Sequence, residues 1–266
     1  MGLGEIYCFY PEIISMIYTS NNIDSLSFAM TIFSFDFSIN KPAATIWRSS
    51  NSSYFGNPVF MIWPISLTKK EKEIYNSLMY DSGPGFLYYC RDLDSISKDS
   101  NLTSSEMALE HTKRSVDLAN RIILDLDALV GNDKEIYFVS EGLSFSSKGN
   151  SVLDLATYKG VLMSKIYERF PSVKIYTYSP MTIKSVAGCA KKDKAKDKHS
   201  MINAFMAEGN LEGNSFWEAL KDGVLSYEVQ KGKRKGETEY IHCVDDIVDS
   251  YFAMKTLSEK EGISLE

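Results

Sequence analysis

The 266-residue sequence has few of the residues that build zinc sites and disulfide scaffolds. It contains four cysteines and three histidines, and no CxxC or paired Cys/His spacing occurs among them. A structural zinc site is therefore not expected. The cysteines lie far apart in the chain, at Cys8, Cys90, Cys189 and Cys243. We expect them to be reduced thiols, as is usual inside cells.

Long apolar runs are also absent. No stretch of 18 apolar residues occurs, so no membrane span and no membrane partner are expected. Residues 1–20 are apolar but lack a basic segment and carry Glu5 and Glu12, which is untypical of a secretory signal peptide. Ile6 stands where a myristoylation motif needs Ser or Thr. We expect a soluble, cytoplasmic protein.

An overall excess of positive charge is missing as well. The net charge is −6, which argues against nucleic acid as a partner, because phosphate contacts need Lys and Arg. The basic residues are, however, concentrated locally. Residues 184–198 contain six lysines against two aspartates, and residues 231–235 read KGKRK. An acidic chain with two basic segments is compatible with DNA binding.

What the sequence does contain is ordinary globular composition, 44% hydrophobic and 24% charged, over a length that suits one large domain. Apolar runs with turn residues between them predict strands, of which the first three suggest an antiparallel meander. The predicted strands cover residues 28–37, 43–48, 58–65, 86–91, 135–140 and 173–179.

The clearest predicted helix begins at Thr103, which forms a T-x-x-E capping box with Glu106. Its apolar stripe is Val116, Ala119, Ile123, Leu126 and Val130, and Gly131 is placed to cap its end. Further helices are predicted at 68–79, 152–170, within 180–208, at 214–222 and at 245–257, with a charged loop or hairpin at 228–239. The order predicts an α/β fold, a mixed sheet flanked by helices.

Two acidic residues close apolar strands. Asp36 follows the run FAMTIFSF, in which Ile32, Ser34 and Asp36 share one face, and Glu141 follows IYFVS. A buried carboxylate costs free energy unless it is paired, hydrogen-bonded or bound to metal. Each residue taken alone is equally explained as a strand-end cap or a solvated loop acid.

A third acidic element is VDDIVDSYFAM, in which Asp246 and Asp249 are three residues apart and so lie on one helix face. Like charges at this spacing repel each other, and Asp245 adds to the repulsion. The alternative explanation is that acids favour the positive N-terminal end of a helix.

The three elements together resemble the ribonuclease-H-like superfamily, and within it the RuvC-like Holliday junction resolvases, especially those of bacteriophages. FSFDFSINKPAATIW resembles the family's first strand, turn and second strand, and the segment from IYFVSEGLSFSSKGN onward resembles its glutamate strand, helix, strand and basic segment. VDDIVDSYFAM resembles the terminal acidic helix, with Ser250 and Ala253 near the small-residue positions.

The resemblance implies a ribonuclease-H-like sheet, an antiparallel meander followed by parallel strands. It also implies a catalytic, metal-binding set of Asp36, Glu141, Asp246 and Asp249. Asp36 would bridge two Mg²⁺ or Mn²⁺ ions, since hard divalent ions prefer oxygen ligands. Asp245 competes for one of the helix positions.

Other residues receive weaker assignments. The resemblance places DNA-backbone contacts at Lys184 and Lys198, and the lysine cluster between them adds Lys191 and Lys192 as candidates; the alternative is a solvated loop. His242 precedes the acidic helix and would suit proton transfer, although an ordinary hydrogen bond is the favoured explanation. Phe145, in the loop after Glu141, would either wedge against a base or pack on the protein.

The resemblance covers about residues 28–48 and 135–258. We therefore predict an N-terminal extension at 1–27, one nuclease domain at 28–258 with an insertion at about 49–100, and a tail at 259–266. The implied function is a metal-dependent endonuclease that acts as a homodimer on Holliday junctions or other branched DNA, in the host cytoplasm if the chain is of phage origin. The alternatives are a nuclease of the same fold acting on flaps or RNA–DNA hybrids, and a non-catalytic nucleic-acid-binding protein.

Overall fold

The computed structural model describes residues 30–38, 40–49, 58–64, 67–80, 87–89, 103–130, 135–142, 150–190 and 198–265. Within these ranges, no helix combines the length and apolar character that crossing a membrane requires. The predicted extension at 1–27 and the Gly131 cap lie outside the described residues.

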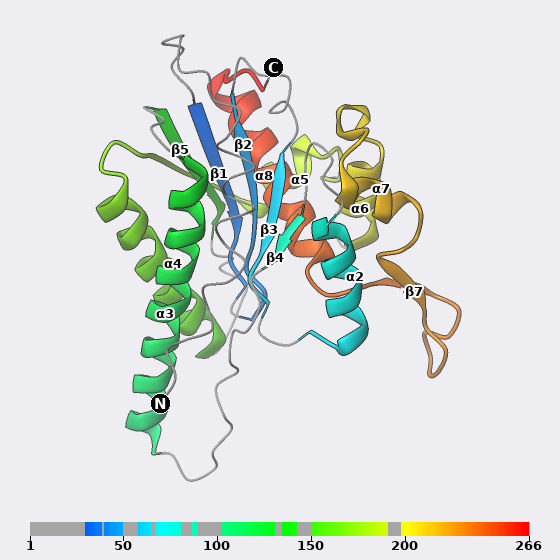
Figure 1. Ribbon diagram of the computed structural model, residues 1–266, viewed down its shortest axis with the longest axis horizontal. Helices are drawn as coiled ribbons and strands as arrows, with labels where there is room; N and C mark the ends of the chain where they lie inside the picture. The colour runs from blue at the N-terminus through cyan, green and yellow to red at the C-terminus, as the bar shows by residue number, and fades with distance from the viewer. Residues whose placement is uncertain are drawn as a thin grey trace.

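A six-stranded mixed sheet forms the centre of the fold, with the strand order β4-β3-β2-β1-β5-β6 (Figure 1). β1 pairs antiparallel with β2 and β2 antiparallel with β3, whereas β5 and β6 extend the sheet in parallel from β1. This confirms the predicted meander followed by parallel strands; β4 adds a further parallel strand at the outer edge. The strands are β1 Met30–Asp36, β2 Ala43–Arg48, β3 Val59–Ile62, β4 Leu87–Tyr89, β5 Glu135–Glu141 and β6 Lys174–Tyr178.

The period-two alternation of β1 separates two apolar cores. Ile32 belongs to the cluster packed against α8, while Phe33 and Phe35 belong to the cluster under α3 and α4. Figure 1 shows α3 and α4 on one face of the sheet and α8 on the other. Because both faces are covered, the central strands are apolar almost throughout.

The helices follow the predicted order. They are α2 Lys69–Tyr80, α3 Ser104–Val130, α4 Asn150–Arg169, α5 Pro180–Val186, α6 Lys198–Met206, α7 Ser215–Lys221 and α8 Val244–Glu261, with a 3₁₀ turn η1 at Gly209–Leu211. The predicted loop or hairpin at 228–239 is a hairpin, formed by β7 Ser226–Glu228 and β8 Thr238–Tyr240.

The capping box of α3 is confirmed. The Thr103 amide donates to Glu106 Oε2 at 2.8 Å, and the Glu106 amide donates to Thr103 Oγ1 at 3.3 Å. The predicted apolar stripe was wrong in part, because Val116 and Ile123 are only partly buried. The buried stripe is rotated slightly and runs through Leu118, Ala119, Ile122, Leu126 and Val130.

Helix α8 lies directly on β1 and β2 through small polar residues. Ser250 is fully buried; its Oγ hydrogen-bonds Thr45 Oγ1 at 2.7 Å, and its carbonyl accepts from Ser34 Oγ at 2.5 Å. Ala253, one turn further along, is also buried. Small side chains at these positions allow the helix axis to approach the sheet closely.

The predicted domain boundaries remain predictions. The region proposed as an insertion, about 49–100, contains β3, whose pairing with β2 makes it part of the central sheet. Helix α8 extends to Glu261, into the predicted tail.

Replacing Ser250 with Leu should test this close approach. The added volume has no space between α8 and the sheet, so unfolding free energy should fall by about 1–3 kcal/mol or more. Ser250→Ala loses only the hydroxyl contacts and should cost about 1 kcal/mol. Urea denaturation of both variants measures this; equal effects would contradict the steric argument.

Candidate functional site

Two of the predicted acidic residues end neighbouring parallel strands. In the β1–β5 pairing Phe35 lies opposite Ser140, so the next residues, Asp36 and Glu141, emerge at the same edge of the sheet. The N-terminal end of α8 lies at this edge (Figure 1). Its first two turns carry Asp246 and Asp249. The fold therefore gathers all four predicted acids from three separate segments.

The electrostatics of Asp36 show how closely the four acids are grouped. Burial raises the pKa of the Asp36 carboxyl well above its ordinary value, and the charges of Asp246, Asp249 and Glu141 raise it further. Asp36 therefore lies close enough to each of the other three acids for their charges to affect it.

The two aspartates of α8 are affected in the same direction. Burial, followed by the charge of Asp245, raises the pKa of Asp246 from 3.8 to about 6. Burial, followed by Glu141, raises the pKa of Asp249 to about 7. Burial also raises the pKa of Glu141. Without compensating cations, ionisation of these acids therefore destabilises the folded chain.

Lys41, in the turn between β1 and β2, supplies part of the compensating charge. Its Nζ lies 3.4 Å from Asp246 Oδ2 and 3.7 Å from Asp245 Oδ1. Burial by itself lowers the pKa of Lys41, but Asp246 and Asp245 outweigh it and the pKa is raised. Sequence reasoning missed this lysine, and its place before Pro42 offers no signal that could have found it.

Lys159 on α4 is a second residue that sequence reasoning missed. The side chain is buried, and Nζ donates to the Glu141 carbonyl oxygen at 2.6 Å. Burial lowers the pKa of Lys159, against the charges of Glu141 and Asp36. A signal was present, since the lysine interrupts the helical apolar stripe of Leu155, Leu162 and Ile166.

The chemistry of these donors fits a hard divalent cation. All four are carboxylates, the oxygen donors that such cations prefer, and the buried Asp246 Oδ2 already faces one cation, the Lys41 ammonium, at 3.4 Å. Among the residues that the structure describes, no group of three or more His, Cys, Asp or Glu side chains is already arranged as a metal site. The acids are gathered and mutually repelling, and a bound cation would have to draw their oxygens together.

The basic residues are only partly placed. Lys184 is in the last turn of α5, and its charge partly offsets the rise in the pKa values of Glu141 and Asp249. Lys198 begins α6, and the next residue, His199, packs edge-on against Tyr240 of β8. Lys191, Lys192 and the loop with Phe145 lie outside the described residues.

His242 is engaged in a structural contact. Its Nδ1 lies 2.8 Å from Glu71 Oε1, which also accepts from the His242 amide at 3.0 Å. Glu71 in turn caps α2 through Thr68. The ordinary hydrogen bond considered for this histidine is therefore present.

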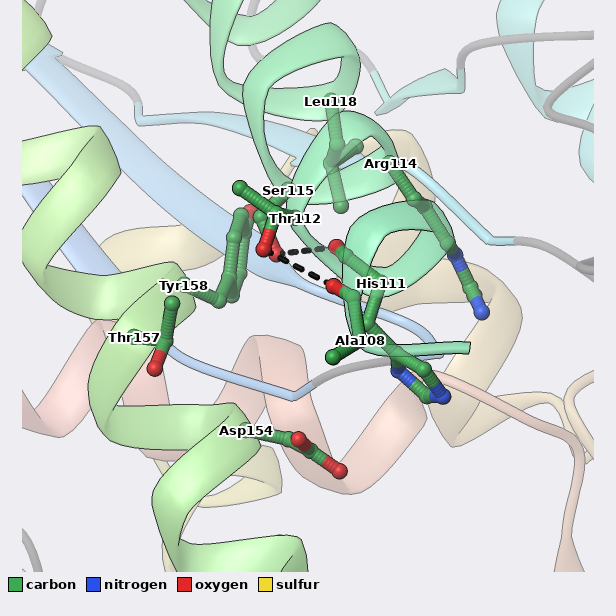
Figure 2. Close-up of a pocket in the computed structure, with 9 residues that line it drawn as sticks. All are labelled: Ala108, His111, Thr112, Arg114, Ser115, Leu118, Asp154, Thr157 and Tyr158. Carbon is green, nitrogen blue, oxygen red and sulfur yellow. Dashed lines mark hydrogen bonds between the residues drawn. The ribbon is translucent and has the colours of Figure 1, made fainter. Parts of the chain in front are cut away.

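A separate cavity of about 190 Å³ lies between α3 and α4 (Figure 2). None of the four acids lines it. Its wall includes Tyr158, whose buried hydroxyl has no hydrogen-bond partner, and Arg114, which donates to Asn40 Oδ1 at 3.2 Å. The Tyr158 ring also packs edge-on against Phe37, directly after Asp36. The cavity thus lies behind the acidic edge rather than at it.

Comparisons with known proteins give limited likeness. No known family profile matches the chain, and no curated protein matches it. Among solved structures, RuvC of Thermus thermophilus matches with a TM-score of 0.40 and 8% identity over 87% of this chain and 97% of that one. The same protein in complex with a Holliday junction substrate matches with a TM-score of 0.36 and 8% identity, over 88% and 97% of the two chains.

The yeast mitochondrial Holliday junction resolvase Ydc2 matches with a TM-score of 0.43 and 13% identity, over 94% of this chain and 88% of that one. Likeness at this level does not establish a shared activity. The functional interpretation of this chain depends instead on its own strand order and carboxylates.

The raised pKa values predict how metal-free stability depends on pH. The folded-state pKa values of Asp246 and Asp249 lie above the unfolded value of 3.8, so the folded chain binds their protons more tightly. Stability should therefore fall as pH rises from about 4 to about 7, by on the order of a few kcal/mol. Urea denaturation in chelator across this range measures the loss.

Asp249→Asn should flatten that pH dependence, since it removes one of the titrating groups. Asp117→Asn, at an exposed site on α3, is the matched control and should leave the pH dependence unchanged. A parental pH profile in Asp249→Asn would show that the acidic cluster does not set it.

Proposed function

We propose that this chain is a divalent-metal-dependent endonuclease that hydrolyses phosphodiester bonds in Holliday junctions or other branched DNA. The observation that carries the proposal is the gathering of Asp36, Glu141, Asp246 and Asp249 at one edge of the sheet, with pKa values raised by burial and, for Asp36 and Asp249, also by the charges of the other acids. Such an arrangement is costly for a purely structural role. It suits a site that binds cations and perturbs ionisation for chemistry.

Mg²⁺ or Mn²⁺, in two ions, is the cofactor proposed for this set of oxygen donors. When bound, two such ions activate a water and stabilise the charge on the attacking and leaving oxygens. Asp36, whose pKa is raised by burial and by the charges of the other three acids, would hold both ions. Glu141 would bind on one side and Asp246 with Asp249 on the other.

The nearby lysines complete the electrostatics. Lys41 and Lys159 offset part of the carboxylate charge. Lys159 also fixes the end of β5 through the Glu141 carbonyl. Lys184, within electrostatic range of Glu141 and Asp249, is placed to attract the phosphate of a bound strand.

The choice of branched DNA rests on the resemblance of the motifs around Asp36, Glu141 and α8 to RuvC-like resolvases. Symmetric cleavage of a four-way junction needs two sites, so we propose a homodimer. Two other functions are compatible with the same acids: a nuclease on flaps or RNA–DNA hybrids, and a nucleic-acid-binding protein without catalysis. Cleavage assays on junction, flap, hybrid and linear duplex distinguish them.

The acids can be tested by substitutions that keep shape and remove charge. Asp36→Asn, Glu141→Gln and Asp246→Asn should each lower the cleavage rate by orders of magnitude, roughly 100-fold or more. Metal-free stability should hold or rise, because one source of repulsion is removed. Cleavage should require Mg²⁺ or Mn²⁺ and stop in chelator, while Ca²⁺ should support little turnover.

Asp222→Asn, at the exposed end of α7, is the matched control and should keep the parental rate. Asp245→Asn tests which of the two neighbouring aspartates binds metal. A larger loss of cleavage rate in Asp245→Asn than in Asp246→Asn would assign the metal-binding role to Asp245. If Asp36→Asn, Glu141→Gln and Asp246→Asn keep near-parental cleavage rates but have lowered melting temperatures, these acids have a structural role and do not form the active site.

The basic segment gives a separate prediction. Replacing Lys184, Lys191, Lys192 and Lys198 with Ala should weaken junction binding and reduce its dependence on salt, because fewer counterions are released. Fluorescence anisotropy over a salt series measures both. A control variant removes the same number of charges elsewhere, by replacing Lys113, Lys165, Lys174 and Lys260 with Ala. An unchanged salt slope in the first variant would show that these four lysines do not contact the DNA.

A further inference from the structure

The hairpin of β7 and β8 is a feature that the proposed active site does not use. It enters and leaves the body of the protein at Leu225 and Ile241, both buried, which are joined by a hydrogen bond from the Ile241 amide to the Leu225 carbonyl at 3.0 Å. Beyond this anchor, it projects away from the helices around it (Figure 1). Every residue from 230 to 238 is exposed.

The turn of this hairpin has a defined conformation. The Gly236 amide donates to the Val229 carbonyl and the Val229 amide to the Glu237 carbonyl, each at 2.9 Å. Gly232 and Gly236 have φ values of 85° and 88°, which side chains with a Cβ rarely adopt. Arg234 Nε pairs with Glu237 Oε2 at 2.7 Å and its guanidinium also pairs with Glu239. Hydrogen bonds and ion pairs thus hold the sequence KGKRK in a closed turn.

Charge is separated along the hairpin. The acids Glu228, Glu237 and Glu239 are on or next to the strands, and the four cations are confined to the turn, residues 231–235. Arg234 is committed to ion pairs inside the hairpin. Lys231, Lys233 and Lys235 are the exposed positive charges that the turn presents.

The position of the hairpin connects it with the acidic edge. β8 ends at Tyr240, and α8, with Asp246 in its first turn, begins only four residues later. The start of α6, to which Lys198 belongs, packs on β8 through the ring contact of His199 with Tyr240. The hairpin therefore adjoins both the start of α6 and the segment that leads into the acidic start of α8.

We propose that this hairpin, residues 226–240, is a basic arm that binds the phosphate backbone of a DNA duplex flanking the cleaved bond. The inference rests on the proposed function, because it takes the acidic edge as the point that the DNA crosses. A turn closed by its own hydrogen bonds and carrying three exposed lysines presents concentrated positive charge to the phosphates of a duplex. The contact adds affinity without reading base sequence.

The test removes the three lysines and keeps the fold of the turn. Lys231→Gln, Lys233→Gln and Lys235→Gln are combined in the full chain, leaving Arg234 and its ion pairs in place. The probe is a four-way junction with arms of two helical turns, roughly 20 base pairs each. Binding is measured by fluorescence anisotropy in Ca²⁺ over a salt series.

The slope of log K against log salt should become shallower by about 2 to 3, since each phosphate contact contributes roughly 0.9. The matched control combines Lys165→Gln, Lys174→Gln and Lys260→Gln, which removes the same net charge elsewhere. Its slope should stay near the parental one. Equal slopes for the two triple variants would contradict the proposal that the hairpin binds DNA, because the three lysines would then act only through the net charge of the protein.

The outcome is separable from that of the proposed function, because binding is measured without cleavage. If the chain binds junctions through the arm but cleaves no substrate with Mg²⁺, the proposed arm is supported and the proposed nuclease activity is contradicted. If the chain cleaves DNA but the arm variant keeps the parental slope, the nuclease activity is supported and the arm is contradicted. Failure to bind any DNA would remove both.

Discussion

The packing of α8 onto β1 and β2 is the contact on which the rest of the structure depends. Ser250 fits between Ser34 and Thr45, where a larger side chain would keep the helix away from the sheet. This contact brings Asp246 and Asp249 to the strand ends that carry Asp36 and Glu141. Hydrophobic burial along the remainder of α8, from Ile247 to Leu257, holds the helix there against the repulsion of the acids.

The repulsion explains the chemistry that surrounds the acids. Burial raises the pKa values of the four carboxylates, and neighbouring acids raise those of Asp36 and Asp249 further. Lysines from different elements supply compensating charge, Lys41 from a turn and Lys159 from α4. The compensation is partial: the Lys41 ammonium lies 3.4 Å from the buried Asp246 Oδ2, yet the pKa of Asp246 is still raised to about 6. The remaining negative charge is what would attract divalent cations, and the surrounding lysines are what would attract the phosphates of a nucleic acid.

The hairpin has a different relation to the fold. It contributes little to either core beyond its anchors, Leu225 and Ile241, and its turn is stabilised by its own hydrogen bonds and ion pairs. Arg234 stabilises the turn, so the basic character of KGKRK available to a partner is that of three lysines rather than four cations. This distinction matters because phosphate binding is governed by the charges left exposed, whereas the sequence shows only the total.

The sequence by itself determined the order of strands and helices, because periodicity and capping are local: the alternation in β1 and the Thr103–Glu106 box are both found as predicted. Its motifs also pointed to the four acids, through the combination of two strand-end acids with a helical pair and the family that this combination resembles. Only the tertiary structure decided which helix residues face inward, so the stripe through Val116 and Ile123 was displaced to Leu118 and Ile122. It alone revealed Lys41 and the pairing of His242 with Glu71. Such contacts join residues far apart in the chain, and their energies depend on distance and burial, which no local pattern encodes.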